Sequence, residues 1–183
     1  MNLPGVTQLL RLSETDSTQT VARFLAEQGA QDGTLVWADR QTAGRGRMSR
    51  KWDSRPGGLY VSLILRPDFP ASRLAGLSIA TAKAAAESIS ELTGIHTAVK
   101  PPNDVYAISD GKARKVCGIL AEASGGSRRL DWVVVGVGVN VNNKVKLPTA
   151  ASLKGLTGRE WVVAEVLRGF LDRFKRSYAK LAG

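Results

Sequence analysis

The chain has 183 residues, of which 43% are hydrophobic and 23% charged. This composition is typical of a folded globular protein and excludes a disordered or collagen-like chain. We expect a single domain over residues 1–183, since the length leaves no room for a large multidomain enzyme. The 26 Lys and Arg residues against 16 Asp and Glu residues give a formal net charge of +10. That charge favours nucleic acid, a phosphate-bearing ligand or an acidic protein as partner, without choosing among them.

Cysteine content and hydropathy indicate the compartment. Cys117 is the single cysteine, so no intramolecular disulfide can form, and we expect a reducing compartment, the cytoplasm. The N-terminal residues lack the basic and apolar regions of a signal peptide. The most apolar stretch, residues 132–139, is far shorter than the roughly 20 residues of a bilayer-spanning helix. We therefore expect no membrane partner.

Taken in chain order, the hydropathy pattern predicts alternating helices and strands. Asp16-Ser17-Thr18 supplies N-cap chemistry for a first helix, and helical spacing of apolar residues marks two longer ones. The expected helices are residues 17–28, 71–92 and 159–180, and the expected strands are residues 8–12, 34–38, 59–65, 97–100, 104–108, 116–123 and 130–141.

Turn signals define how the later strands connect. Asp110-Gly111 and Gly125-Gly126 predict hairpins between consecutive strands. The expected fold is therefore α+β, with a mixed, largely antiparallel sheet and helices packed on one face. The N-terminal region has no space for a helix-turn-helix, so we expect no DNA-binding domain of that kind.

The loop of residues 41–52 is the sharpest feature of the sequence. Residues 44–52 read Gly-Arg-Gly-Arg-Met-Ser-Arg-Lys-Trp. The glycines allow close approach to a ligand, and the cations suit a carboxylate or a polyphosphate. A solvated basic loop or a nucleic-acid contact explains the composition equally well. The P-loop pattern is absent, which disfavours Walker-type ATP binding.

A strand with alternating glycines follows later in the chain. In residues 133–142 the odd-numbered valines share one face, expected to meet the helices, whereas Gly136, Gly138 and Asn140 share the other. Glycines on a strand face leave room for a ligand or for a closely packed backbone. No third glycine opens a helix, so the segment is not a dinucleotide fingerprint.

Three further polar positions have both a structural and a functional interpretation. Lys115 begins an apolar strand, either as an exposed strand-end charge or as an ammonium beside a phosphate or carboxylate. Asn103 and Asp104 follow two prolines and either cap the backbone or hold a metal-bound nucleotide. Residues 16–18 are either an N-cap or a site for a polar ligand group.

Some chemistries are not indicated. The single histidine, His96, is expected to be structural, and no His or Cys cluster has metal-ligand spacing. No serine or cysteine lies in a nucleophile elbow, so covalent hydrolase catalysis is not expected.

Together and in this order, these segments resemble the catalytic domain of the biotin protein ligases, which attach biotin to the carrier domain of acetyl-CoA carboxylase and related proteins. The glycine- and arginine-rich loop is the most specific of them. The matching segments are residues 16–18, 41–52, 58–63, 100–104, 115–122 and 136–140. The resemblance implies the class II synthetase-like fold of that domain.

The resemblance also implies a two-step reaction. Biotin and ATP, with Mg²⁺, would form biotinyl-5′-AMP and pyrophosphate, and the ε-amine of a lysine on a biotin carboxyl carrier protein would then displace AMP. The implied catalytic residues are Lys115, Arg45 and Arg47. The implied biotin-binding residues are Ser17, Thr18, Gln41, Gly44, Arg45, Arg47, Lys115, Gly118, Gly136 and Gly138. The implied ATP- or adenylate-binding residues are Arg47, Arg50, Trp52, Asn103, Asp104, Lys115 and Asn140.

No fixed metal site is implied; Mg²⁺ would arrive with ATP, near Asp104. The chain departs from the family at Pro101, where an aromatic residue is usual, and we expect no small β-barrel after the last helix. Lipoyl or octanoyl transfer and a basic nucleic-acid-binding module are the alternative functions; under the ligase interpretation no DNA partner is expected. The sequence leaves a homodimer through paired sheet edges open.

Overall fold

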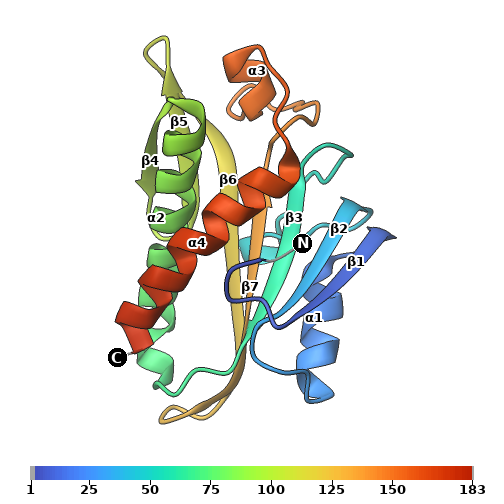
Figure 1. Ribbon diagram of the computed structural model, residues 1–183, viewed down its shortest axis with the longest axis vertical. Helices are drawn as coiled ribbons and strands as arrows, with labels where there is room; N and C mark the ends of the chain where they lie inside the picture. The colour runs from blue at the N-terminus through green and yellow to red at the C-terminus, as the bar shows by residue number, and fades with distance from the viewer. Residues whose placement is uncertain (1–2, 183) are drawn as a thin grey trace.

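A seven-stranded sheet organises the computed structural model, which describes residues 3–182 (Figure 1). The strands are β1 (Gln8–Thr15), β2 (Thr34–Gln41), β3 (Leu59–Leu65), β4 (His96–Lys100), β5 (Asp104–Ser109), β6 (Lys112–Gly125) and β7 (Leu130–Val139). The α-helices are α1 (Thr18–Glu27), α2 (Leu74–Thr93), α3 (Leu153–Thr157) and α4 (Val163–Ala182). Short 3₁₀ turns cover Arg47–Ser49 and Ala71–Arg73.

The strand order across the sheet is β1-β2-β3-β7-β6-β5-β4. β1 and β2 run parallel, and every other neighbouring pair is antiparallel. The mixed, largely antiparallel sheet is thus confirmed. Both predicted hairpins are present, and their turns use backbone with positive φ at Asp110 (51°), Gly111 (69°) and Gly125 (128°).

The sheet separates two hydrophobic cores. The odd-numbered valines of β7 belong to the larger core, together with buried residues of α2 and α4 such as Leu77 and Leu167. Val134, on the opposite face, belongs to a smaller core with Ala22 and Ala26 of α1. The predicted alternation of β7 is therefore confirmed, and its glycine face lies on the α1 side of the sheet.

The expectation that the helices cover one face is wrong for α1. Its alanines pack on Val36, Ile64 and Val134, whereas α2 and α4 pack on each other and on the other face. β3 is buried along its whole length, because both of its faces are covered. Its continuous apolar run is typical of a strand enclosed on both sides.

The last helix also differs from the prediction. It begins at Val163 rather than near residue 159, because two hydrogen bonds to Asn142 hold Trp161 outside the helix. Asn142 Nδ2 donates to Trp161 O (2.8 Å), and Trp161 N donates to Asn142 Oδ1 (3.0 Å). The unpredicted helix α3 precedes it, capped by Ser152, whose Oγ accepts from Gly155 N (3.1 Å). Among residues 3–182, no helix has the length and apolar character needed to span a bilayer.

The packing of α4 gives a first prediction. Leu167 is 0% exposed, and Leu167→Ala is expected to lower the free energy of unfolding by about 2–5 kcal/mol, through lost burial and the cavity left behind. Urea denaturation measures the change. The exposed neighbour Arg168 is the matched control, and Arg168→Ala should stay within about 0.5 kcal/mol of the wild type. Equal stability of the two variants would contradict the core assignment.

Candidate functional site

A cavity of about 360 Å³ opens on the α1 side of the sheet. Its walls are the N-terminus of α1, the loop after β2, strands β6 and β7, and a segment of residues 143–150. Segment 149–151 is held beside β6, since Lys115 N donates to Thr149 O (2.9 Å) and Ala151 N donates to Lys115 O (3.0 Å). The cavity is therefore built from regions far apart in the sequence.

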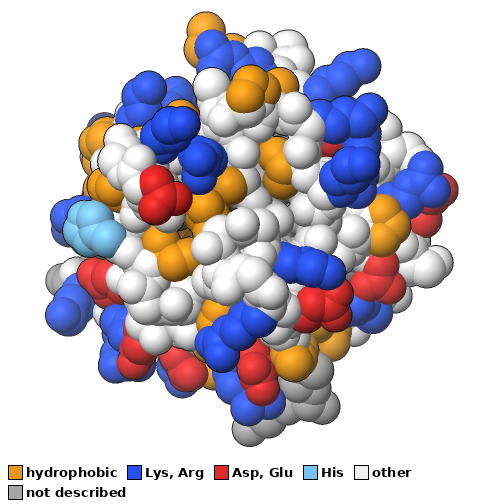
Figure 2. Space-filling view, turned by 90° about the horizontal axis from the view of Figure 1, so that it is seen from above, with side chains coloured by type: hydrophobic (Ala, Val, Ile, Leu, Met, Phe, Trp, Pro, Cys, Tyr) orange, Lys and Arg blue, Asp and Glu red, His pale blue; other side chains and the backbone are white. Residues whose placement is uncertain are grey.

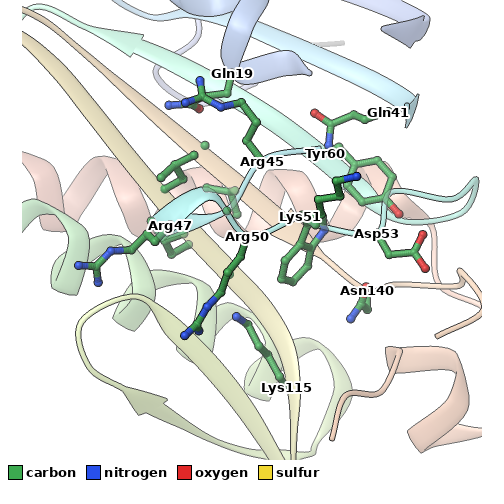
Figure 3. Close-up of a pocket in the computed structure, with 18 of the residues that line it drawn as sticks. Gln19, Gln41, Arg45, Arg47, Arg50, Lys51, Asp53, Tyr60, Lys115 and Asn140 are labelled. Carbon is green, nitrogen blue, oxygen red and sulfur yellow. The ribbon is translucent and has the colours of Figure 1, made fainter. Parts of the chain in front are cut away.

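The arginine-rich loop crosses in front of β6 and β7 (Figure 3). Internal backbone hydrogen bonds shape it: Gly46 N donates to Arg50 O (2.8 Å), and Trp52 N donates to Gly44 O (2.9 Å). Met48 and Ser49 have φ values of 55° and 59°, in the left-handed region that costs non-glycine residues energy. This conformation places the loop cations at the cavity.

Three of the cavity cations have partners within the chain. Lys115 Nζ lies 2.7 Å from Asp104 Oδ1. Arg45 makes two parallel hydrogen bonds to Glu122, at 3.3 and 3.0 Å, and Arg47 Nη1 donates to Asn103 Oδ1 at 3.1 Å. The cationic lining residues are Arg45, Arg47, Arg50, Lys51, Lys115, Lys144 and Lys146, and the acidic ones are Asp53 and Asp104. Lys115 and Arg50 lie at one end of the cavity, which attracts anions (Figure 3). The Arg45–Glu122 pair lies toward Gln19 instead, since Glu122 is opposite Val134 in the β6–β7 pair and Gln19 Nε2 donates to Val134 O.

The end around Thr18 and Ser62 is buried, and its hydrogen-bonding groups are polar and neutral. Thr18 N and Thr18 Oγ1 donate to Gln41 Oε1 (2.8 and 3.1 Å). Thr18 Oγ1 also lies 3.0 Å from Ser62 Oγ, which donates to Gln19 Oε1 (3.0 Å). Ser17 is 1% exposed, and its Oγ has no hydrogen-bond partner within the described residues. A buried hydroxyl without a partner is costly, so this end suits a neutral polar ligand group.

The side chains of Trp52 and Gln19 pack on the glycine face of the sheet. A Cβ at Gly138 or Gly118 would lie 2.7 or 2.8 Å from the Trp52 ring, and a Cβ at Gly136 would lie 2.4 Å from Gln19 Oε1. The Trp52 indole therefore rests directly on the backbone of β6 and β7. Lys115 Nζ lies 5.3 Å from the centroid of that ring, which is within cation–π range.

Two titratable groups near the cavity are held neutral. Burial raises the pKa of the Cys117 thiol to about 12, an effect that Lys115 partly opposes. Burial also raises the pKa of Tyr60, whose hydroxyl donates to Arg55 O at 2.7 Å. Neither group is available as an anion at neutral pH.

Comparison with known proteins identifies the family to which this site belongs. Residues 12–140 match the Biotin/lipoate A/B protein ligase family. The chain belongs to that family.

Several relatives within the family are biotin ligases. The chain is 41% identical over 169 residues to the "Bifunctional ligase/repressor BirA" of Bacillus subtilis, covering 88% of this chain and 51% of that protein. It is 35% identical over 160 residues to the "Biotin--[acetyl-CoA-carboxylase] ligase" of Mycobacterium tuberculosis, covering 83% and 57%. The chain thus spans about half the length of these relatives.

A solved structure shares the fold over nearly the whole chain. The Aquifex aeolicus biotin protein ligase, in complex with biotin and ATP, superposes with a TM-score of 0.82 at 38% identity, covering 96% of this chain and 72% of that one. The predicted fold class and family resemblance are confirmed.

The structure brings nearly all of the predicted site residues of this family member to one cavity. The lining includes Ser17, Thr18, Gln41, Arg45, Arg47, Arg50, Trp52, Asn103, Asp104, Lys115, Gly118, Gly136, Gly138 and Asn140. Gly44 lies outside this lining: a Cβ there would be 2.5 Å from Trp52 O and Ser54 Oγ, so its role in the structure is close packing within the loop. Which of these residues contact a ligand stays a prediction.

Other lining residues were not predicted from the sequence. They include Gln19, Ser62, Asn143 and the segment 144–147. Ser62 had a usable signal, since it is the one polar residue within the apolar strand β3. The segment carries no motif, and it lies directly before residues 149–151, which pair with Lys115.

The site residues do not form an evident metal centre. Within residues 3–182, no group of at least three His, Cys, Asp or Glu side chains is arranged to hold a metal ion. Asp104 is paired with Lys115, and Asn103 Oδ1 accepts from Arg47. Near the expected Mg²⁺ position, one oxygen of Asp104 and the amide oxygen of Asn103 thus already lie beside cationic side chains.

The Arg45–Glu122 pair gives a prediction about the loop. Glu122→Ala removes the acceptor for both Arg45 hydrogen bonds, so trypsin should cleave after Arg45 at least threefold faster than in the wild type. Mass spectrometry of the early fragments measures the rate. Glu14→Ala is the control, because it breaks the exposed pair between Glu14 and Arg40 (2.8 Å) instead. Identical cleavage rates at Arg45 in all three proteins would show that Glu122 does not restrain the loop.

Proposed function

We propose that the chain carries biotin–protein ligase activity. It would activate biotin with ATP to biotinyl-5′-AMP and transfer the biotinyl group to a lysine of a biotin carboxyl carrier protein. The observation that carries the proposal is the division of one cavity into a neutral hydrogen-bonding end and a cationic end, linked by the glycine face of β6 and β7. Biotin has the matching division, with a neutral ureido ring at one end and a carboxylate at the other.

The neutral end would hold the ureido ring. Ser17 Oγ has no partner within the described residues and would donate to the ureido carbonyl. Thr18 and Gln41, already joined at 3.1 Å, would present oxygen acceptors to a ureido N–H. Gly136 would contribute indirectly, by leaving room for Gln19. Buried, hydrogen-bonded groups of this kind give specificity because an unsuited ligand leaves them without partners.

The cationic end would perform the first chemical step. A carboxylate oxygen of biotin attacks the α-phosphorus of ATP, and the bond to the pyrophosphate oxygen breaks. Both reactants are anions, so the main requirement is fixed positive charge and orientation. Lys115 would neutralise the carboxylate and α-phosphate, Arg45 and Arg47 would cover the acyl-adenylate, and Arg50 would meet the outer phosphates. Arg50 and Lys115 are both visible at this end in Figure 3.

The nucleotide would lie against Trp52 and Asn140. Trp52 would provide an aromatic wall, supported from behind by Gly118 and Gly138. Asn140 is 6% exposed and accepts at Oδ1 from Asn143 Nδ2 (3.0 Å), which fixes its orientation. Asn103 would act through Arg47, to which it is hydrogen-bonded at 3.1 Å.

Mg²⁺ would enter as part of the ATP substrate. Within residues 3–182, no group of at least three His, Cys, Asp or Glu side chains offers a cation site of the protein's own. In this proposal Asp104 orients the Lys115 ammonium, from 2.7 Å.

The second step needs a protein partner. The lysine ε-amine of the carrier would attack the acyl carbon of biotinyl-AMP, forming the amide and releasing AMP. The net charge of +10 favours an acidic carrier, and Figure 2 shows Lys and Arg side chains in clusters on one face of the molecule. The compartment of such carriers would be the cytoplasm.

The direct test is to mix the protein with biotin and MgATP and to measure biotinyl-AMP by mass spectrometry. Accumulation of biotinyl-AMP supports the proposal. Product with lipoate or octanoate but not with biotin would favour the acyl-transfer alternative. Steeply salt-dependent nucleic-acid binding without any effect of biotin would favour the binding module.

The role of Lys115 gives a prediction for this reaction. Lys115→Ala should lower pyrophosphate release at least about a hundredfold, because removing one preorganised group that acts on developing charge has this effect. The unfolding midpoint should change little, since Lys115 lies at the cavity surface. Lys112→Ala, an exposed lysine of the same strand, should leave the rate unchanged. A rate for Lys115→Ala equal to that of the wild type would remove Lys115 from the mechanism.

A further inference from the structure

The orientation of the buried Gln19 amide is fixed by the backbone. Gln19 lies in the first turn of α1 and is 3% exposed. Its Nε2 donates to Val134 O of β7 (3.2 Å), and its Oε1 accepts from Ser62 Oγ (3.0 Å). A backbone carbonyl can only accept a hydrogen bond, so the amide nitrogen must face Val134. The amide oxygen therefore faces Ser62.

Gln41 is fixed in the same way at the other end of the network. Thr18 N donates to Gln41 Oε1 (2.8 Å), and Gln41 Nε2 donates to Ser54 Oγ (2.6 Å). A backbone N–H can only donate, so the oxygen of this amide must face Thr18. Two amide oxygens thus face inward, toward the hydroxyls of Thr18 and Ser62.

This arrangement is one proton short. The chain of oxygens has three links: Gln41 Oε1 to Thr18 Oγ1 (3.1 Å), Thr18 Oγ1 to Ser62 Oγ (3.0 Å) and Ser62 Oγ to Gln19 Oε1 (3.0 Å). Each hydroxyl carries one proton, so Thr18 and Ser62 supply protons for only two of the three links. One oxygen pair must face each other without a proton between them.

The shortage determines which ligand completes the site. A ligand N–H supplies the missing donor, whereas a ligand oxygen at the same place adds another acceptor to a group of acceptors. We propose that Gln19 is a positioning residue that, by taking the Ser62 proton, makes this end of the cavity select a ligand group with an N–H donor, such as a cyclic urea. This inference rests on the proposed function and adds the residue that sets its specificity.

The sheet is built to accommodate Gln19 in this position. A Cβ at Gly136 would lie 2.4 Å from Gln19 Oε1, so a residue other than glycine would displace the amide. Ser17 Oγ, 1% exposed and without a partner in the described part of the chain, lies in the same cavity lining. It can donate to a carbonyl next to the ligand N–H, and a cyclic urea presents both groups side by side.

The test compares two ligands of nearly equal shape by calorimetry. The first is biotin, and the second is the cyclic carbamate in which one ureido N–H of biotin is replaced by oxygen, prepared as both regioisomers. The wild type should prefer biotin at least about a hundredfold over one regioisomer, as a site built to bind an N–H donor rejects its replacement. In Gln19→Met the hydroxyl protons of Thr18 and Ser62 suffice for the two oxygen–oxygen links that remain. The preference for biotin over the carbamate should therefore shrink at least tenfold. Thr20→Val, at an exposed position of the same helix, should keep the wild-type preference.

Ser62→Ala provides a second, independent variant. This variant also removes the proton shortage, because only the link between Gln41 and Thr18 remains and the Thr18 hydroxyl supplies its proton. The preference for biotin over the carbamate should shrink similarly. Because Gln19 acts through Ser62, the double variant should show no further narrowing beyond Ser62→Ala alone. A merely structural role of Gln19 would weaken both ligands equally and leave their ratio unchanged. Should Gln19→Met not fold, the ratio in Ser62→Ala decides.

The outcomes separate the inference from the proposed function. Suppose that the wild type binds biotin and makes biotinyl-AMP, but that the preference for biotin over the carbamate in the folded variants stays within twofold of the wild-type preference. The inference is then overturned, and the proposed function stands. If the wild type binds no biotin, the proposed function and the ligand class inferred here both fail. A narrowed preference with an unchanged unfolding midpoint supports the inference.

Discussion

Gly118 and Gly138 face each other across the β6–β7 pair, and the bare backbone there sets how closely any group can approach this face of the sheet. A Cβ at either position would come within 2.8 Å of the Trp52 ring, so the ring can rest on the strands only because both side chains are missing. Trp52 N also donates to Gly44 O, which ties the two ends of the arginine-rich loop together. The distance between the loop cations and Lys115 therefore depends on these two glycines.

Periodicity predicted the faces of single strands but not which helix covers each face. The alternation of β7 correctly separated the valines from the glycines, because successive side chains of a strand must point to opposite sides. Nothing in the short apolar stripe of α1 distinguishes the two faces of β3, since that strand is buried on both. The predicted start of α4 was wrong for a related reason. Asn142 holds Trp161 from 19 residues away, and this contact overrides the local helical pattern.

The candidate site was predictable where its residues lie in compact motifs, and unpredictable where partners are distant. The loop of residues 44–52 and the strand beginning at Lys115 carry their chemistry in adjacent residues. Gln19 and Ser62, by contrast, meet across 43 positions, and Arg45 and Glu122 across 77. Such contacts depend on the packing of α1 against β3 and on the strand order β3-β7-β6, which places β3 and β6 on either side of the glycine strand. The local sequence does not predict that strand order.

The charge distribution of the cavity has a consequence for ligand orientation. The neutral end holds its polar groups in buried hydrogen bonds, whereas the pairs Lys115–Asp104 and Arg45–Glu122 are partly exposed, with side-chain exposures of 22–28% and 24–40%. Because neither pair is closed off from solvent, an incoming anion can approach Lys115 and Arg45 directly. A carboxylate at the buried end would instead lose its hydration without meeting a cation, which costs several kcal/mol. Under the proposed function, a ligand with one neutral and one anionic end would therefore bind in a single direction, with its anionic group beside Lys115.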